Sequence, residues 1–196
     1  LNEEIIHGIP SGRILQEGDI VSLDFGVLHE GFYSDSAITV PVGRVAEEAL
    51  RLIAAARTAF LEGLTMFREG NRLSDVSAAV QRSVEAEGFS VIRQFVGHGI
   101  GRSLHEEPQV PNFGTPGRGP RLKPGMTLAI EPMIAAGDWE VEVLEDGWTA
   151  VTKDRGLSAH YEHTVALTAD GLEILSARKG DPIKTPAAAY KENPYA

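Results

Sequence analysis

The 196-residue chain contains no cysteine. A disulfide framework and a thiolate-ligated metal site are therefore excluded, and any metal ion must be held by oxygen atoms and imidazole nitrogens. The lack of disulfides makes the cytoplasm the simplest location to expect. No stretch approaches the roughly 18 consecutive apolar residues of a membrane-spanning helix, so we expect no membrane partner.

Basic residues are also scarce. Lys and Arg number 18 against 28 Asp and Glu, which gives a formal net charge of -10. Nucleic acids and anionic membranes bind basic surfaces, and no dense Lys/Arg run occurs, so we expect neither as a partner. The content of 42% hydrophobic and 23% charged residues is typical of one soluble domain. We expect a monomer that acts on small or neutral substrates.

Two carboxylates lie in a predicted β-hairpin near the start of the chain. Residues 19–28 and 32–40 are rich in strand-forming side chains and flank the turn dipeptide Glu30-Gly31. A two-residue turn there places Asp24 and Asp35 on one face, whereas a three-residue turn without a bulge places them on opposite faces. Like charges on one sheet face repel unless a cation lies between them, so the two-residue turn favours a metal site.

Two amphipathic helices are predicted after the hairpin. Apolar residues recur at three-and-four spacing over residues 45–69, and this helix ends near Gly70. A second helix is predicted over residues 75–87, with Ser74 as its N-cap and Gly88 at its end. Their apolar faces predict that the two helices pack as a pair.

The second half of the chain is predicted to form a sheet. Strand-like runs cover residues 91–96, 127–134, 140–144, 148–152 and 160–168. Residues 111–124 contain three Gly and four Pro, which predicts an irregular loop. We expect an α+β domain over residues 1–176 and a C-terminal tail over residues 177–196.

Two glutamates lie within apolar strand-like runs. Burying Glu131 or Glu162 as an unpaired charge would be costly, so each needs a cation or a proton unless it faces water. Strand alternation places Glu162 on the same face as His160 and places His163 on the opposite face. We interpret both histidines as surface or hydrogen-bonded core residues that lie outside the site.

A glycine-rich segment carries two further histidines. His98 is flanked by Gly97, Gly99 and Gly101, and these poor helix formers predict a strand, a tight loop and a return that carries His105. Such glycines allow the backbone to approach a ligand closely, although a Gly-rich turn with incidental histidines is the simpler interpretation. Together with the acids on other strands, this imidazole would suit a two-metal site.

Five segments together resemble the type I methionine aminopeptidases. They are residues 2–10, the Asp24/Asp35 hairpin, 97–110, 129–133 and 158–164, and the resemblance extends to about Ser176. The run Gly-His-Gly-Ile-Gly, followed four residues on by His-Glu-Glu-Pro, is the most specific part. The resemblance implies the pita-bread α+β fold, an antiparallel sheet backed by helices. It also implies metal-dependent removal of the N-terminal methionine from peptides and nascent proteins.

The same resemblance implies roles for individual residues. Two divalent ions, of Co, Mn, Fe or Zn, would be held by Asp24, Asp35, His98, Glu131 and Glu162. A hydroxide bridging the ions would attack the first peptide bond, and Glu131 would carry the proton. His105 and His7 would contact the scissile amide from opposite sides. An apolar pocket for the methionine side chain would be lined by Phe95, Leu104 and Trp148.

Members of that family continue upstream of the segment that matches residues 2–10, with a helix pair and a first strand. We therefore expect that this chain lacks an N-terminal segment and that apolar surface is uncovered as a result. Two alternative functions stay open, namely a related hydrolase of Xaa-Pro bonds, such as a prolidase or aminopeptidase P, and a non-catalytic binding module with the same fold. All five ligand positions carry competent side chains, which favours an enzyme.

Overall fold

The computed structural model describes residues 1–178, which form an α+β structure. The helices are α1 (Glu47–Met66) and α2 (Leu73–Ala86). The strands are β1 (Glu4–Ile6), β2 (Ile20–His29), β3 (Phe32–Pro41), β4 (Ser90–Val91), β5 (Gly97–Gly99), β6 (Glu106–Val110), β7 (Thr127–Ile130), β8 (Met133–Ala135), β9 (Val141–Val143), β10 (Ala150–Thr152), β11 (Ser158–His160), β12 (Glu162–Thr168) and β13 (Gly171–Ile174). The predicted fold class is therefore confirmed.

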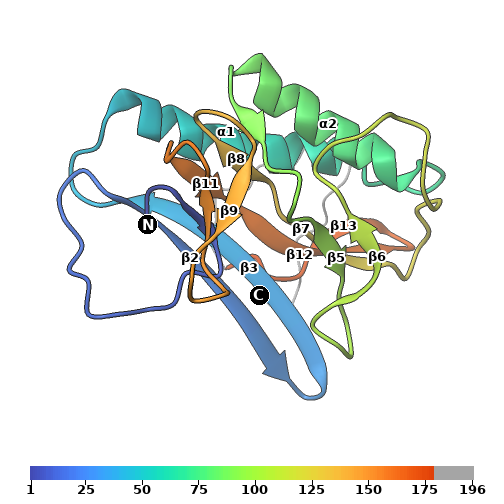
Figure 1. The fold of residues 1–196 in the computed structure, drawn as a ribbon. Coiled ribbons are helices and arrows are strands. Elements are labelled where there is room, and N and C mark those ends of the chain that lie inside the picture. The colour runs from blue at the N-terminus through green and yellow to red at the C-terminus, as the bar shows by residue number, and fades with distance from the viewer. Residues whose placement is uncertain (179–196) are drawn as a thin grey trace.

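The strands form three sheets in which the paired strands run antiparallel. The largest has the order β2-β3-β12-β7-β5-β6, with β13 also paired to β12. Two smaller sheets have the orders β11-β8-β4 and β1-β10-β9. Figure 1 shows the two helices together on one side of the strands, while the far end of the β2–β3 hairpin projects away from them.

The main core lies between the helix pair and the sheets. Leu52 and Phe60 of α1 and Val76 of α2 are buried there against Ile130 of β7 and Val165 of β12. Burial of side chains of this size stabilises the fold by about 1.5–3 kcal/mol each. Strand β2 forms an exposed edge of the largest sheet, and the apolar side chains of residues 25, 27 and 28 face solvent.

The hairpin has the register that favours a metal site. His29 pairs with Phe32, so that Glu30 and Gly31 form a two-residue turn, and both have positive φ angles, of 49° and 84°. The same ladder pairs Gly26 with Asp35. The predicted two-residue turn is therefore confirmed, and Asp24 shares a sheet face with Asp35.

Two predicted strands are each broken at a glutamate of interest. The run over residues 127–134 divides into β7 and β8 because Glu131 and Pro132 carry the chain from the large sheet into a smaller one, and proline has no amide hydrogen for a ladder. The run over residues 160–168 divides at Tyr161 into β11 and β12, which belong to the same two sheets. Glu131 and Glu162 thus both lie where the chain changes sheets.

Other predicted boundaries also differ from the structure. In place of the predicted strand over residues 91–96, the structure has only the two-residue strand β4. The partner of β4 is β8, which is only three residues long and also pairs with β11. The strands over 140–144 and 148–152 shorten to β9 and β10, and α1 is shorter than the predicted 45–69.

The predicted N-cap of the second helix is wrong. Arg72 holds that position, and the Asp75 carboxylate accepts the Arg72 amide hydrogen at 2.7 Å. Ser74 lies inside the helix, where its hydroxyl donates to the Arg118 carbonyl at 2.8 Å. Gly88 follows the end of α2, as predicted, and its φ angle is 81°.

The irregular loop over residues 111–124 is confirmed apart from an isolated bridge at Arg121. Neither helix in the described part of the chain is long and apolar enough to cross a bilayer. Residues 179–196, most of the predicted tail, lie outside the described residues, and the division at residue 176 stays a prediction.

Candidate metal centre

The five predicted ligands converge from separate elements on one cavity of about 330 Å³. Asp24 and Asp35 come from β2 and β3, His98 from β5, Glu131 from the break after β7, and Glu162 from the start of β12. Neighbouring strands bring them together, since β12 lies between β3 and β7, and β5 pairs with β7. Sequence reasoning therefore selected side chains that are adjacent in space although they span 139 positions, from 24 to 162.

The imidazole of His98 is oriented towards the acids. Its Nδ1 lies 2.9 Å from the carbonyl oxygen of Gly99, and because a carbonyl only accepts, Nδ1 carries the hydrogen. The Nε2 lone pair then faces Oε1 of Glu131 at 3.4 Å and Oδ2 of Asp35 at 3.9 Å. A backbone carbonyl that fixes the ring in this way is typical of metal-binding histidines.

Hydrogen bonds at the backbone hold two of the acids in place. The Thr164 hydroxyl accepts the Asp35 amide hydrogen at 2.8 Å and donates to the Asp35 carbonyl at 2.9 Å. The buried side-chain amide of Asn112 donates to the Glu131 carbonyl at 2.9 Å. These two residues were missed in the sequence, because nothing local marks a threonine or an asparagine as the partner of a distant acid.

The four acids are crowded, and Asp35, Glu131 and Glu162 are buried, which disfavours their ionised forms. Burial raises the pKa of Glu131 and of Glu162 well above the usual range, and the neighbouring carboxylates raise both further. Burial, followed by the charge of Asp35, raises the pKa of Asp24 to about 6. Burial also raises the pKa of Asp35. A cation among these side chains would remove the penalty, so the cluster favours a bound positive ion.

The interpretation of His160 as a surface or hydrogen-bonded core residue is wrong. Its side chain is 1% exposed, and among the described residues neither ring nitrogen has a hydrogen-bond partner. Nε2 lies 3.7 Å from Oε2 of Glu131 and 3.8 Å from Oε2 of Glu162. Burial, followed by the charge of His7, lowers the pKa of His160 to about 3, so the imidazole is neutral. The face that it shares with Glu162 in the strand pattern was the signal that could have identified it.

For His163, the interpretation as a surface or hydrogen-bonded core residue is correct. Its Nδ1 is 2.8 Å from the Ser176 hydroxyl, and its Nε2 is 3.2 Å from the Tyr161 hydroxyl. His163 is therefore a hydrogen-bonded core residue that points away from the acids.

The side chains fit divalent ions in two overlapping groups. One group is Asp35, His98 and Glu162, and the other is Asp24, His160 and Glu162. In each group the potential ligand atoms lie within 4.8 Å of one another, and Glu162 belongs to both. Oxygen and imidazole ligands of this kind suit first-row transition metals.

Four of the five predicted substrate-contacting residues line the same cavity, and Trp148 does not. His7 and His105 are exposed and line it together with Phe95 and Leu104. The ring of His105 packs edge-on to His98 with 4.4 Å between centroids. Trp148 is 63% exposed and reaches the cavity only through the His7 ring, 6.3 Å away.

Sequence comparison places this site in a known class of enzyme. Residues 1–169 match metallopeptidase family M24. The match covers most of the chain and all five predicted ligands. The chain therefore belongs to metallopeptidase family M24.

Within that family, methionine aminopeptidases share about half of their sequence with this chain. The methionine aminopeptidase of Clostridium perfringens is 54% identical over 179 residues, which are 91% of this chain and 72% of the relative. The crystal structure of the Thermotoga maritima methionine aminopeptidase superposes with a TM-score of 0.88 at 51% identity, covering 90% of this chain and 72% of that chain. The pita-bread fold is thereby confirmed, and the chain is a methionine aminopeptidase.

A prolidase is a more distant relative. The recombinant prolidase of Thermococcus sibiricus superposes with a TM-score of 0.68 at 26% identity, covering 88% of this chain and 42% of that chain. The identity is about half of that shared with the Thermotoga maritima enzyme, so the comparisons favour the methionine-specific enzymes over the Xaa-Pro alternative.

Proposed function

We propose that methionine aminopeptidase activity in this chain depends on two divalent metal ions held by Asp24, Asp35, His98, Glu131 and Glu162. Asp35 and Glu162 would be shared between the two ions. The observation that carries this proposal is the pair of ligand groups that have Glu162 in common. Mn, Fe, Co and Zn are all compatible with carboxylate and imidazole ligands.

Glu131 would carry the proton. Bound divalent ions supply Lewis acidity that polarises the scissile carbonyl and makes water available as a nucleophile near neutral pH. Glu131 is 5% exposed and lies on the cavity beside the other proposed ligands. A carboxylate held next to the attacking water can take a proton from it and deliver that proton to the leaving amine.

His105 and His7 would stabilise the transition state by donating hydrogen bonds. Both line the cavity, and His105 lies beside His98, where the carbonyl oxygen of the substrate would be bound. Partial desolvation of the ring, followed by the charge of His105, lowers the pKa of His7, so a neutral ring is available to hold the amide from the other side. Donors placed where negative charge develops typically contribute factors of about 10²–10³ to kcat.

The substrate would be a peptide or a nascent protein that begins with methionine. Phe95 and Leu104 give the cavity an apolar wall beside the proposed metal ligands, and the ring of Trp148 lies next to His7. An apolar wall of this kind suits a flexible thioether side chain. A cytoplasmic location and a monomeric state, both expected from the sequence, are part of this proposal.

The proposal is tested by metal-dependent release of methionine from the peptide Met-Ala-Ser. We expect chelation to abolish the activity and metal to restore it. The variant Glu131→Gln should lower kcat by about 10²–10⁴, because the proton carrier is lost. Glu145→Gln changes an exposed glutamate and serves as the matched control. Full activity of Glu131→Gln, or faster cleavage of Ala-Pro than of Met-Ala-Ser, would contradict the proposal.

Metal analysis separates the enzyme from a binding module. We expect two divalent ions per chain after dialysis against Mn(II) or Co(II). A metal-free protein under these conditions would instead favour the non-catalytic alternative, because the proposed hydrolysis needs bound metal to activate water.

A further inference from the structure

His160 is a buried imidazole whose hydrogen-bonding capacity is unused. It ends β11 and is 1% exposed, and among residues 1–178 neither Nδ1 nor Nε2 has a hydrogen-bond partner. Buried polar groups in folded proteins are nearly always satisfied, and leaving one without a partner is destabilising. The position therefore favours a ligand that residues 1–178 do not supply.

The distances around His160 suit a shared metal ion better than a hydrogen bond. Nε2 is 3.7 Å from a Glu131 oxygen and 3.8 Å from a Glu162 oxygen, beyond the usual range for hydrogen bonds. Two atoms that each bind one ion at about 2.1 Å lie about 3–4 Å apart. The same is true of His98, whose Nε2 is 3.4 Å from Glu131 and 3.9 Å from Asp35. The two imidazoles thus flank Glu131, one facing each carboxylate oxygen.

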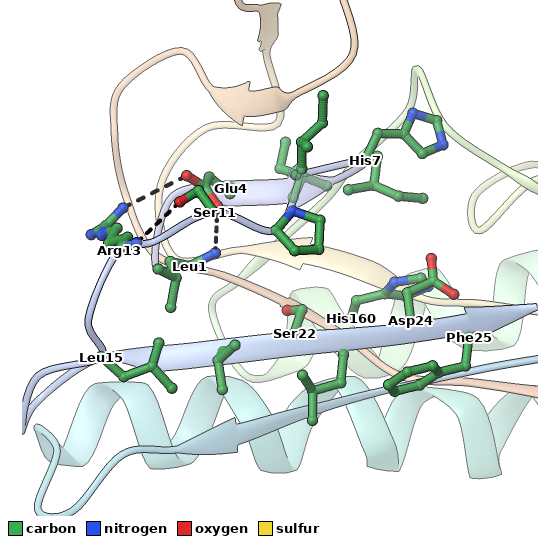
Figure 2. A pocket seen from close by; sticks show the side chains of 17 residues that line it. Leu1, Glu4, His7, Ser11, Arg13, Leu15, Ser22, Asp24, Phe25 and His160 are labelled. Atoms are coloured by element: carbon green, nitrogen blue, oxygen red, sulfur yellow. Dashed lines mark hydrogen bonds and ion pairs between the residues drawn. The ribbon is translucent and has the colours of Figure 1, made fainter.

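Asp24 is the further ligand on the His160 side. Its carboxylate, His160 and Glu162 have ligand atoms within 4.8 Å of one another. Figure 2 shows Asp24 and His160 next to each other beneath His7, at one end of a second cavity, of about 440 Å³, that lies between the N-terminal segment and β2. The His160 ring is thus in contact with the proposed metal centre and not enclosed in the apolar core.

Two hydrogen bonds to a threonine hydroxyl hold the backbone of His160, as they do the backbone of Asp35. The Thr39 hydroxyl accepts the His160 amide hydrogen at 2.8 Å and donates to the His160 carbonyl at 2.9 Å. Thr164 makes the equivalent pair of bonds to Asp35, at 2.8 and 2.9 Å. A fixed backbone orients the side chain in advance of binding, as a metal ligand requires.

We propose that His160 is a sixth side-chain ligand that binds the ion on the Asp24 side, so that each of the two ions has one imidazole. This inference rests on the two-ion centre proposed above. An added nitrogen ligand favours Fe, Co, Ni and Zn over the harder ions Mg and Mn at that position. His160 would therefore set the metal preference of the second ion.

The proposal is tested on the unaltered protein by counting imidazoles with X-ray absorption at the cobalt edge, after addition of one and then two equivalents of Co(II). With both histidines as ligands, the count stays at one imidazole per cobalt at both loadings. If His98 is the only histidine ligand, the count falls to half an imidazole per cobalt at the second loading, which would overturn the proposal. Binding of a single ion would overturn the two-ion centre itself, and this inference with it.

The variant His160→Gln provides a second measurement by calorimetric titration with Co(II). We expect the first binding step to be unchanged and the second to weaken by about 10-fold or more, since even the loss of a group next to a ligand typically costs 10–100-fold. Mn(II) should lose less affinity in its second step, because it gains less from a nitrogen ligand. His29→Gln changes an exposed histidine at the end of β2 and is the matched control.

Equal second-step affinities in His160→Gln and His29→Gln would overturn the proposal. Circular dichroism and thermal melting check that both variants are folded. If His160→Gln does not fold, the imidazole count on the unaltered protein decides the question.

Discussion

Gly26 lies directly opposite Asp35 across the β2–β3 hairpin. A Cβ atom at Gly26 would stand 3.4 Å from the Leu104 side chain and 3.9 Å from an Asp35 carboxylate oxygen. Both are ordinary contacts, so this side of the cavity has room for a methyl group. A longer side chain would enter the space between the apolar wall and the proposed metal centre.

We therefore predict that Gly26→Ala keeps its activity on Met-Ala-Ser, whereas Gly26→Leu loses about 100-fold in kcat/KM. Both variants should keep their secondary structure, because position 26 lies in an exposed strand and aliphatic side chains are compatible with strands. Steady-state kinetics and circular dichroism measure the two effects. An active Gly26→Leu variant would show that substrate does not occupy this side of the cavity.

Stability of the metal-free protein should decrease as pH rises. The pKa of Asp24 is about 6 in the folded protein, above the value of about 3.9 for an unfolded chain. The folded state therefore binds this proton more tightly. The resulting stabilisation is complete below the unfolded pKa and is lost as pH rises through about 6. Burial and neighbouring carboxylates also raise the pKa of Glu131 and of Glu162, which acts in the same direction.

Asp24→Asn tests this pH dependence in the presence of chelator. The substitution removes one ionising group and also lowers the repulsion on Asp35, Glu131 and Glu162. The melting temperature of Asp24→Asn relative to the parent protein should therefore increase from pH 5 to pH 8. Glu145→Gln, at an exposed position, should show no such trend. Identical pH profiles for both variants would contradict the prediction.

Local patterns in the sequence predicted the parts of the site that local geometry controls. The Glu30-Gly31 dipeptide predicted the turn, and the turn determined that Asp24 and Asp35 share a face. The glycines around His98 predicted a strand and its return, which are β5 and β6. These features depend on residues a few positions apart, where turn chemistry and strand alternation are sufficient.

Features that depend on distant partners could not be predicted. The Thr39 bonds to His160 join residues 121 positions apart, and the Thr164 bonds to Asp35 join residues 129 positions apart. The strand breaks at Glu131 and Tyr161 arise because the chain changes sheets there. The sequence of an apolar run does not show whether the run forms one strand or two. His160 was misinterpreted for this reason, since its environment is built by other segments.

Gly99 is required by close packing between strands, and not by backbone conformation. A Cβ atom there would collide with the backbone carbonyl of Glu107 on the neighbouring strand. Gly99→Ala should therefore lower the free energy of unfolding by about 1–3 kcal/mol or prevent folding, because β5 and β6 must separate. At Gly101 a Cβ atom would meet only the end of the Glu106 side chain, at 3.3 Å. That flexible group can move, so Gly101→Ala should be tolerated. Urea unfolding compares the two variants, and equal stabilities would contradict the packing argument.

Thr164 should matter both for stability and for metal affinity. Its hydroxyl is the hydrogen-bond partner of both the amide and the carbonyl of Asp35, and the residue is 1% exposed. Thr164→Val keeps the shape of the side chain but leaves these buried groups unsatisfied, which typically costs about 1–3 kcal/mol. Asp35 would then be poorly positioned, so we expect the affinity for Co(II) to fall by about 10–100-fold.

Thr164→Ser restores the hydroxyl and is the matched control for this position. It should recover most of the Co(II) affinity lost in Thr164→Val, although it removes a buried methyl group and so loses about 1 kcal/mol of stability. A purely structural role would make stability and metal affinity decline together in both variants. Recovery of metal affinity without full recovery of stability is therefore the result that identifies Thr164 as a positioning residue for Asp35. Isothermal titration with Co(II) and urea unfolding, measured on the same preparations, separate these two outcomes.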